Sequence, residues 1–282
     1  MKKQLFLAGA GIILVAALFL FGRTTEPKKP TPNKPLKEGP ISFDAEAFIH
    51  NARQKLSPSQ VLFVSSLENT VKRGDVHAQQ IAAYTGLANF WKDSIQLFEP
   101  YAFYISKAAE LDNSEKNLTF AAQLFLDNLR GEHDEAKMNW KKERAISLFE
   151  KAIALNPEND DLKIGLGSCY VFGAGSGGDP TEVMKGIQKL LEVVRKDSNN
   201  MKAQLVLGVG GYVSGQYDKG ITRLQKVIAQ QPNNIEAIAF LADTYAAKGD
   251  KVEAIKWYTI SKRLVNNPGY SKEVDERIKS LK

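Results

Sequence analysis

The sequence predicts an all-α protein, a solenoid of helical hairpins that follows one transmembrane helix and a Pro/Lys-rich linker. Three observations lead to this prediction. From position 41 onward, apolar residues recur at three- and four-residue spacing, with almost no alternation of period two. The C-terminal part repeats with a fixed period. An uncharged apolar run stands near the N-terminus.

The apolar run extends from Leu5 to Phe21 and contains 17 residues. As a helix it would reach roughly 26 Å at about 1.5 Å per residue, the lower limit for a bilayer core of about 30 Å. We assign residues 1–22 to an N-terminal membrane anchor, with a cleaved signal sequence as the alternative. The run continues past Val15-Ala16-Ala17, its only acceptable cleavage triplet, which favours the uncleaved anchor.

The charges beside this run set its expected orientation. Lys2 and Lys3 favour a cytoplasmic N-terminus, although Arg23, Lys28 and Lys29 on the other flank argue the opposite way. We expect a single-pass protein of the cell inner membrane whose body lies on the periplasmic or extracytoplasmic side rather than in the cytoplasm.

Residues 23–40 hold five of the eleven prolines and four lysines. Proline fixes φ and has no amide donor, so this stretch favours an extended polyproline II conformation and predicts a spacer between membrane and body. A ligand for a proline-binding domain is the alternative.

Charge and composition limit the function of the body. The formal charge is +6, but residues 1–40 carry seven Lys/Arg against two Glu, and the other 242 residues carry 31 basic and 30 acidic side chains. This balance argues against nucleic-acid binding. The single Cys169 excludes an intrachain disulfide, and the three scattered histidines do not suggest a zinc centre. We therefore predict no metal and no cofactor.

The body begins with helices over residues 41–103 that fit the later period poorly. Ser57, Pro58 and Gln60 form a helix start with a capping box, and Gly74-Asp75 marks a break between helices.

The strongest signal is a repeat of 34 residues, in which Met201–Asn234 aligns with Ile235–Pro268. In this register Gly215 matches Gly249, which predicts a tight turn inside each unit. Residues 160–200 fit the same unit if seven residues are inserted in their turn. RAISLFEKAIALNPEN, which begins at Arg144, fits a second helix, and YISKAAELDNS, which begins at Tyr104, fits another if about ten residues are inserted around Gly131 to Trp140.

These units resemble the tetratricopeptide repeat family over residues 104–268. The resemblance rests on the following residues of the last two units: Leu207-Gly208, Gly215, Tyr217, Gly220 and Pro232, then Leu241-Ala242, Tyr245, Gly249, Ala254 and Tyr258. It implies hairpins in which small residues let the two helices approach closely. Stacked hairpins need a polar end cap, which we assign to a helix over residues 269–282.

In this family the first helix of each hairpin lines the concave surface, which implies a groove that binds a protein or peptide. The implied groove residues are Asp161, Ile164, Ser168, Val171, Phe172, Lys202, Leu205, Val209, Tyr212, Val213, Glu236, Ala239, Asp243, Ala246 and Ala247. The family's carboxylate clamp uses Lys and Asn, but here Ile164, Leu205 and Ala239, with Ser168, Val209 and Asp243, occupy those positions. An apolar groove with charged edges suits an amphipathic helix or an extended peptide.

Two other uses of these residues stay open. The groove residues could cover the chain's own N-terminal helices, or a second copy in a homo-oligomer. An enzyme ranks third, because no base, nucleophile and metal ligand converge in the sequence, so we predict no catalytic residues. The main hypothesis is a membrane-anchored scaffold in an envelope assembly or maturation complex.

The segment Gly173–Gly178, GAGSGG, has the spacing of a dinucleotide-binding loop. A helix rather than a strand precedes it, so we interpret it as an insertion between paired helices. Gly173, Gly175, Gly177 and Gly178 form a possible contact loop, since insertions in repeat arrays often fall on a binding side.

Two further groups have simple structural interpretations. Cys169 lies within a predicted first helix and is interpreted as a packed residue, with a reactive thiol as the alternative. The acidic residues around His133 are interpreted as a solvated loop, with a weak cation site as the alternative.

Overall fold

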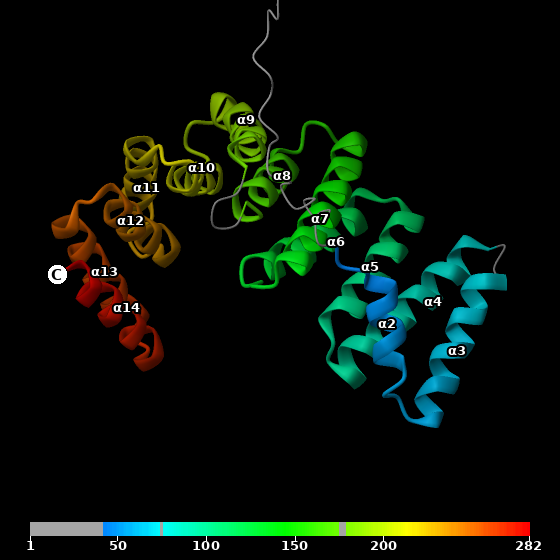
Figure 1. Ribbon diagram of the computed structural model, residues 1–282. Helices are drawn as coiled ribbons and strands as arrows, with labels where there is room; N and C mark the ends of the chain where they lie inside the picture. The colour runs from blue at the N-terminus through cyan, green and yellow to red at the C-terminus, as the bar shows by residue number, and fades with distance from the viewer. Residues whose placement is uncertain (1–41, 74–75, 175–178) are drawn as a thin grey trace, which may run out of the picture. The chain divides into compact units, whose positions relative to one another are not determined.

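The structure, a computed structural model, describes residues 42–73, 76–174 and 179–282 (Figure 1). Residues 41–282 pack as one unit. The regular elements of the described residues are all helical, which confirms the predicted fold class. In chain order they are α2 (Ala45–Arg53), α3 (Pro58–Arg73), α4 (His77–Asn89), the π-helix η1 (Phe90–Ile95), α5 (Phe98–Asp112), α6 (Glu115–Leu129), α7 (Glu135–Leu155), α8 (Asp160–Phe172), α9 (Pro180–Lys196), α10 (Met201–Val213), α11 (Tyr217–Gln230), α12 (Ile235–Lys248), α13 (Lys251–Val265) and α14 (Pro268–Leu281).

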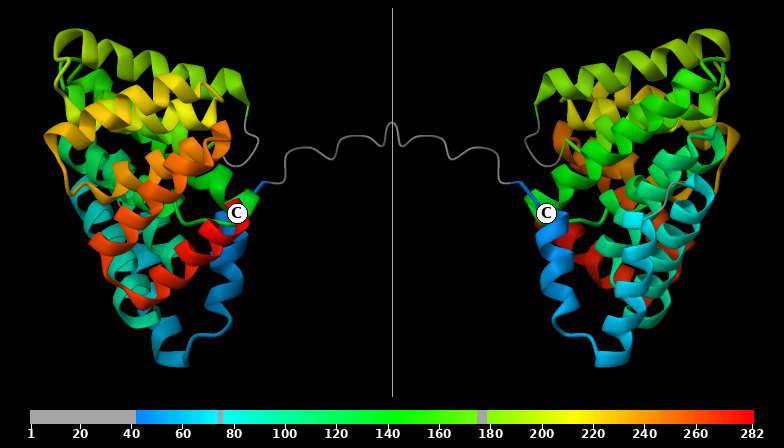
Figure 2. Two further views of the ribbon diagram at one scale, coloured as in Figure 1. Left: turned by 90° about the vertical axis from the view of Figure 1, so that its left-hand side faces the viewer. Right: turned by 90° about the vertical axis from the view of Figure 1, so that its right-hand side faces the viewer.

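Consecutive helices pair into hairpins, α4 with α5, α6 with α7, α8 with α9, α10 with α11, and α12 with α13. Each second helix also packs on the first helix of the next hairpin, and the first helices α6, α8, α10 and α12 contact one another in series. Figure 2 shows this order from both sides, with the C-terminal hairpins nearest the viewer on the left and the N-terminal ones on the right. The first helices therefore form one continuous layer.

Asparagine side chains start the first helices of the repeats. The Oδ1 atoms of Asn159, Asn200 and Asn234 accept hydrogen bonds from backbone N–H groups in the first turns of α8, α10 and α12 at 2.9–3.0 Å. The predicted capping box at α3 is also present, because Ser57 N donates to Gln60 Oε1 at 2.9 Å and Gln60 N donates to Ser57 Oγ at 3.3 Å.

Glycines in the turns and at the helix contacts explain the register of the repeats. Gly215 and Gly249 have φ values of +72° and +89°, a conformation that favours glycine, and both stand in the turn inside a hairpin. A Cβ atom on Gly186 would lie 2.7 Å from the carbonyl oxygen of Gly167, and one on Gly220 would lie 2.9 Å from that of Gly208. The predicted close approach of paired helices is confirmed at both places.

The structure corrects where the unusual segments fall. The predicted boundary at residue 104 lies inside α5, a second helix that begins at Phe98 and pairs with α4. The residues expected as an insertion around Gly131 to Trp140 mostly lengthen α7, which has 21 residues. Asp134 starts this helix by accepting a hydrogen bond from Lys137 N at 3.0 Å.

The last helix covers the end of the array. Val274 of α14 is buried and belongs to the same apolar cluster as Tyr258 of α13 and Leu241 of α12. Within the described residues, no helix combines the length and hydropathy needed to span a membrane. The predicted anchor over residues 1–22 and linker over 23–40 lie outside the described residues.

Candidate interaction groove

A cavity of about 430 Å³ opens along the layer of first helices. Helices α6, α8, α10 and α12 contribute nearly all of its wall, and α7 contributes one aromatic ring. The residues that line it are Thr119, Gln123, Leu126, Arg130, Phe149, Asp161, Ile164, Gly165, Ser168, Lys202, Leu205, Val206 and Glu236. The cavity thus crosses four successive hairpins.

The floor of this groove is apolar. Leu126 of α6 and Ile164 of α8 are buried, and Leu205 of α10 is half-buried. Gly165 lets the Phe149 ring of α7 lie against α8, because a Cβ atom at this position would stand 2.4 Å from ring carbons. The sequence therefore builds an apolar floor by placing glycine where the ring needs room.

Two ion pairs form the rim. Arg130 Nη1 donates to Glu236 Oε1 at 2.7 Å, and Lys202 Nζ donates to Asp161 Oδ1 at 3.1 Å. Both pairs join different hairpins, and their side chains are substantially exposed. The rim is therefore polar but nearly neutral, which favours neither a strongly acidic nor a strongly basic ligand.

An aromatic group continues the groove beyond the cavity. The Phe240 ring lies 6.3 Å from the Phe172 ring and 6.2 Å from the Tyr212 ring, measured between centroids. The Arg130 guanidinium lies 3.9 Å from the centroid of Phe172. All three rings are half-buried, so part of each faces solvent. Burial raises the pKa of Tyr212, and nearby Asp243 raises it further, so the phenol stays neutral at physiological pH.

The structure distributes the predicted groove residues unequally. Asp161, Ile164, Ser168, Lys202, Leu205 and Glu236 meet in the cavity, while Phe172 and Tyr212 join the aromatic group. Val171 and Val209 are each only 1% exposed and pack in the core between α8, α9 and α10, so they are not part of the exposed surface of the groove. Val213, Ala239 and Ala246 are half-buried, and Ala247 is exposed.

Asp243 has partners within the chain. Its Oδ1 accepts hydrogen bonds from Arg277 Nη1 of α14 at 2.8 Å and from the hydroxyl of Tyr258. The expected free charge at the edge of the groove is therefore compensated by the C-terminal helix.

Several groove residues lie outside the sequence prediction. Arg130, Gln123 and Thr119 come from α6, which has no recognisable repeat signature, and Phe240 is on a first helix but was not among the predicted inward positions. The sequence signal that marks α6 is a serine cap, Ser114, followed by an apolar stripe. In the structure the Ser114 hydroxyl accepts a hydrogen bond from Asn117 N at 3.4 Å.

The remaining candidates are the glycine loop, Cys169 and a metal site. Gly173 is buried at the end of α8, while Gly175, Gly177 and Gly178 lie outside the described residues. Burial raises the pKa of the Cys169 thiol well above its usual value, so this packed cysteine is not an activated thiol. In the described residues no group of three His, Cys, Asp or Glu is placed to hold a metal ion.

The acidic turn around His133 has a structural use. Glu132 accepts hydrogen bonds from the backbone N–H groups of His133 and Asp134 at 2.9 Å and from Lys141 Nζ at 2.6 Å. Burial opposes ionisation of this carboxyl, but the bonds from Lys141 and the backbone lower its pKa to about 2. The carboxylate is thus engaged in fixing the start of α7.

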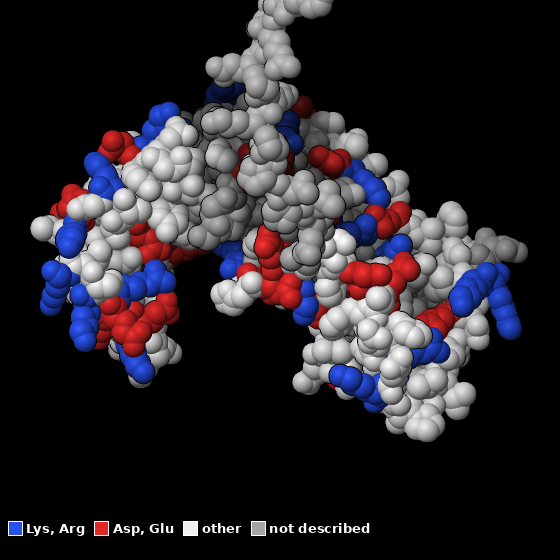
Figure 3. Space-filling model, viewed as in Figure 1, with Lys and Arg blue, Asp and Glu red and all other residues white. Residues whose placement is uncertain are grey.

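Charges of both signs are interspersed on the face shown in Figure 3, and neither sign gathers into a continuous patch there. This distribution agrees with the near-neutral charge of residues 41–282.

Comparisons with known proteins agree with this geometry. Residues 214–271 match the tetratricopeptide repeat family. A thermophilic tetratricopeptide repeat protein of Thermus thermophilus is similar with a TM-score of 0.52 and 16% identity, over 71% of this chain and 98% of that chain. A tetratricopeptide repeat protein of Parabacteroides merdae is similar with a TM-score of 0.52 and 13% identity, over 84% of this chain and 90% of that chain. No curated protein matches the sequence.

The fold and its groove define a helical-repeat protein whose first helices form a continuous layer. Residues 214–271 match the tetratricopeptide repeat family, and the described part of the chain shares its fold with the two tetratricopeptide repeat proteins.

Proposed function

We propose that this protein is a membrane-anchored scaffold that docks a protein partner in the groove of α6, α8, α10 and α12. The partner contributes the apolar face of an amphipathic helix or of an extended peptide. The protein acts only by binding and positioning this partner. It does so within a complex for envelope assembly or maturation.

The observation that supports this proposal is the line of half-buried apolar side chains along the first helices. Leu205, Phe172, Tyr212 and Phe240 each keep part of their surface in solvent, and the charges of the two rim ion pairs compensate each other. Apolar surface of this kind gains free energy when a partner removes it from water, at about 25 cal/mol per Å². A polar rim around an apolar centre is the arrangement found at protein interfaces.

Site-specific photo-crosslinking tests the location of the partner. A benzophenone amino acid at Gln123, which is exposed and lines the groove, should give one defined protein adduct in native membranes. The matched control is Phe120, three residues earlier on α6, which is 54% exposed and outside the groove lining. Equal adducts from both positions would argue against the groove.

The substitution Tyr212→Asp tests the aromatic group. It should suppress the Gln123 adduct while leaving the helical circular dichroism signal unchanged, because a carboxylate beside Phe240 opposes apolar docking. Phe120→Asp is the control and should leave the adduct intact. A loss of helicity in Tyr212→Asp would mean that this ring serves the core instead.

A second copy of the chain is the alternative occupant. Light scattering on the full-length protein in detergent tests this alternative. A stable dimer, together with a Gln123 adduct that contains a second copy of the chain, would show that the protein is a structural homo-oligomer and not a scaffold for another protein.

We further propose that residues 1–22 anchor the protein, on the basis of their apolar run and flanking lysines. A reporter that is active only outside the cytoplasm, fused after residue 40, should be active. An inactive fusion would place the body on the cytoplasmic side.

A further inference from the structure

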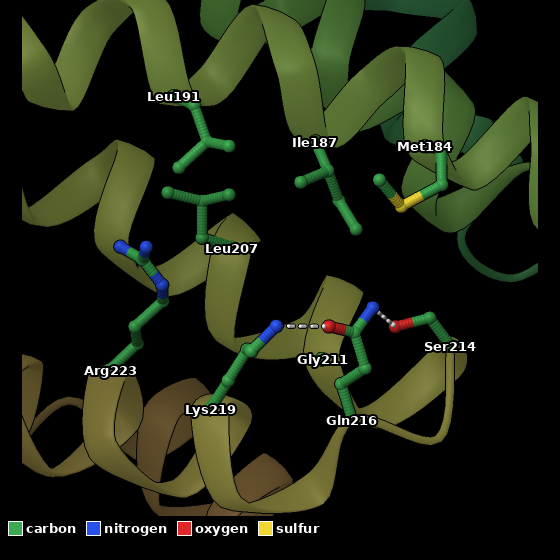
Figure 4. A pocket seen from close by; sticks show the side chains of 9 residues that line it. All are labelled: Met184, Ile187, Leu191, Leu207, Gly211, Ser214, Gln216, Lys219 and Arg223. Atoms are coloured by element: carbon green, nitrogen blue, oxygen red, sulfur yellow. Dashed lines mark hydrogen bonds between the residues drawn. The ribbon is translucent and has the colours of Figure 1, made fainter.

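A second cavity, of about 280 Å³, opens between α9, α10 and α11 (Figure 4). The lining of this α9–α11 pocket shares no residue with the groove described above. It lies between the second helices of two neighbouring hairpins, with the first helix α10 at its base.

One wall of the pocket is apolar. Met184, Ile187 and Leu191 stand at spacing i, i+3 and i+7 on α9, so they lie on one face of that helix. Figure 4 shows Leu191 facing Leu207 of α10, with Ile187 and then Met184 following along the same side of the pocket. Met184 is 40% exposed, so this end of the stripe is open to solvent.

The opposite wall is basic. Lys219 and Arg223 are one turn apart on α11. Lys219 Nζ donates to Gln216 Oε1 at 2.7 Å, and Arg223 Nη1 donates to Gln204 Oε1 at 2.7 Å. Neither side chain forms an ion pair with a carboxylate of the described residues, although seventeen such contacts join other side chains there. Burial also lowers the pKa of Arg223.

We propose that the α9–α11 pocket binds a second partner segment, an acidic amphipathic helix that lays an apolar stripe on Met184, Ile187 and Leu191 and directs carboxylates to Lys219 and Arg223. Figure 4 shows the apolar side chains of α9 on one side of the pocket and the basic side chains of α11 on the other, which suits a helix with an apolar stripe beside an acidic one. Carboxylates would supply the charge that the pocket lacks. This site is additional to the proposed groove and does not depend on it.

Charge complementarity selects this occupant over the chain's own N-terminal segment. Residues 1–40 carry seven basic and two acidic side chains, so they would repel Lys219 and Arg223. A small aliphatic carboxylate such as decanoate also combines an apolar part with a negative charge. The experiment below therefore compares its binding with that of helical peptides.

Fluorescence anisotropy with the full-length protein in detergent provides the test. The probe is a labelled helical peptide with leucines at spacing i, i+3 and i+7 and glutamates along the adjacent stripe; the comparison peptide has every glutamate replaced by glutamine. The glutamate peptide should bind roughly tenfold or more tightly, and the difference should shrink as salt is added.

Variants of the protein locate the binding. Lys219→Glu should weaken the glutamate peptide about tenfold, whereas Lys219→Arg should retain it. Lys116→Glu, an exposed lysine of α6 with the same charge change, is the matched control and should have no effect. Met184→Asp should weaken both peptides, because it interrupts the apolar stripe.

Three results would overturn the proposal. Equal binding of the two peptides, or unchanged binding by Lys219→Glu, would remove the role of the basic wall. Binding of decanoate without binding of either peptide would assign the pocket to a small carboxylate. Tyr212→Asp should leave peptide binding unchanged, so failure here is distinguishable from failure of the groove.

Discussion

Arg130, at the end of α6, pairs with Glu236, in the first turn of α12, at 2.7 Å although 106 residues separate them in the chain. The same guanidinium lies over the ring of Phe172 at the end of α8. One side chain therefore connects three first helices across the groove. Any partner seated in the groove must pass beside this contact or open it.

A double-mutant cycle of Arg130→Ala and Glu236→Ala should give a small coupling energy. Both side chains are more than one third exposed, so water screens the pair and about 0.5 kcal/mol is expected. Urea unfolding at low and high salt measures it, and the coupling should fall with salt.

A coupling above about 2 kcal/mol, or one insensitive to salt, would contradict a solvent-screened pair. Arg130→Ala alone should cost somewhat more than Glu236→Ala, because it also removes the contact with Phe172.

The sequence predicts the hairpins well because their causes are local. The turn glycines Gly215 and Gly249 and the Asn caps act within a few residues, so a 34-residue period exposes them. The groove depends on contacts between distant segments. The Arg130–Glu236 pair joins residues 106 positions apart, which is not a multiple of the repeat period, so the repeat does not predict it.

The same reasoning explains the two valines. A first helix has apolar residues on more than one side, and the sequence does not say which side faces the next hairpin. Val171 and Val209 fit the expected inward stripe, but α8, α9 and α10 close over them. The distinction between core and surface requires the angle at which successive hairpins pack.

Gly211→Ala should destabilise the protein by about 1–2 kcal/mol. A Cβ atom at this position would lie 2.7 Å from the backbone N and Cα of Gly220, so α10 and α11 must move apart. The better helix propensity of alanine, about 1 kcal/mol, offsets only part of this cost. Thermal or urea unfolding followed by circular dichroism measures the change.

Gly131→Ala is the control for this substitution, because no atom lies within 4 Å of its Cβ position and its φ is not positive. It should change stability by less than about 0.5 kcal/mol. Equal effects at the two positions would mean that the close approach of α10 and α11 is not the cause of the lost stability.

Glu132→Gln should destabilise the start of α7 by about 3 kcal/mol at neutral pH, because Lys141 would keep a buried ammonium without its carboxylate. The folded-state pKa of Glu132 is about 2, below its ordinary 4.5, so the wild type holds this stability above pH 4.5 and loses it as pH falls toward 2. The difference between wild type and variant should narrow over that range.

Urea unfolding at several pH values measures this difference. Glu135→Gln, an exposed carboxylate in the same turn, is the control and should give no comparable effect. A difference that widens on acidification would contradict the assigned direction of the pKa shift.

Cys169 should not react with a thiol reagent in the native protein at about pH 8, near the ordinary pKa of a free thiol. Its side chain is fully buried and burial raises the pKa of the thiol, so the thiolate is neither populated nor reachable. One equivalent should react after unfolding in urea. Rapid native labelling would instead support the reactive thiol.

Removal of residues 268–282 should expose the apolar end of the array. Val274 is 2% exposed and packs with Tyr258 and Leu241, so their surface would meet water when α14 is absent. Loss of the buried Val274 contacts alone should cost about 2 kcal/mol. Urea unfolding and binding of a hydrophobic dye report the two effects.

Two point variants separate the parts of this cap. Arg277→Ala removes only the half-exposed bonds to Asp243 and Glu273, so it should cost about 0.5–1 kcal/mol. Lys272→Ala, at an exposed position of α14, should be neutral. If the truncated protein kept the wild-type unfolding midpoint and bound no more dye, the apolar face of α13 would not need this helix, and the capping role of α14 would have to be abandoned.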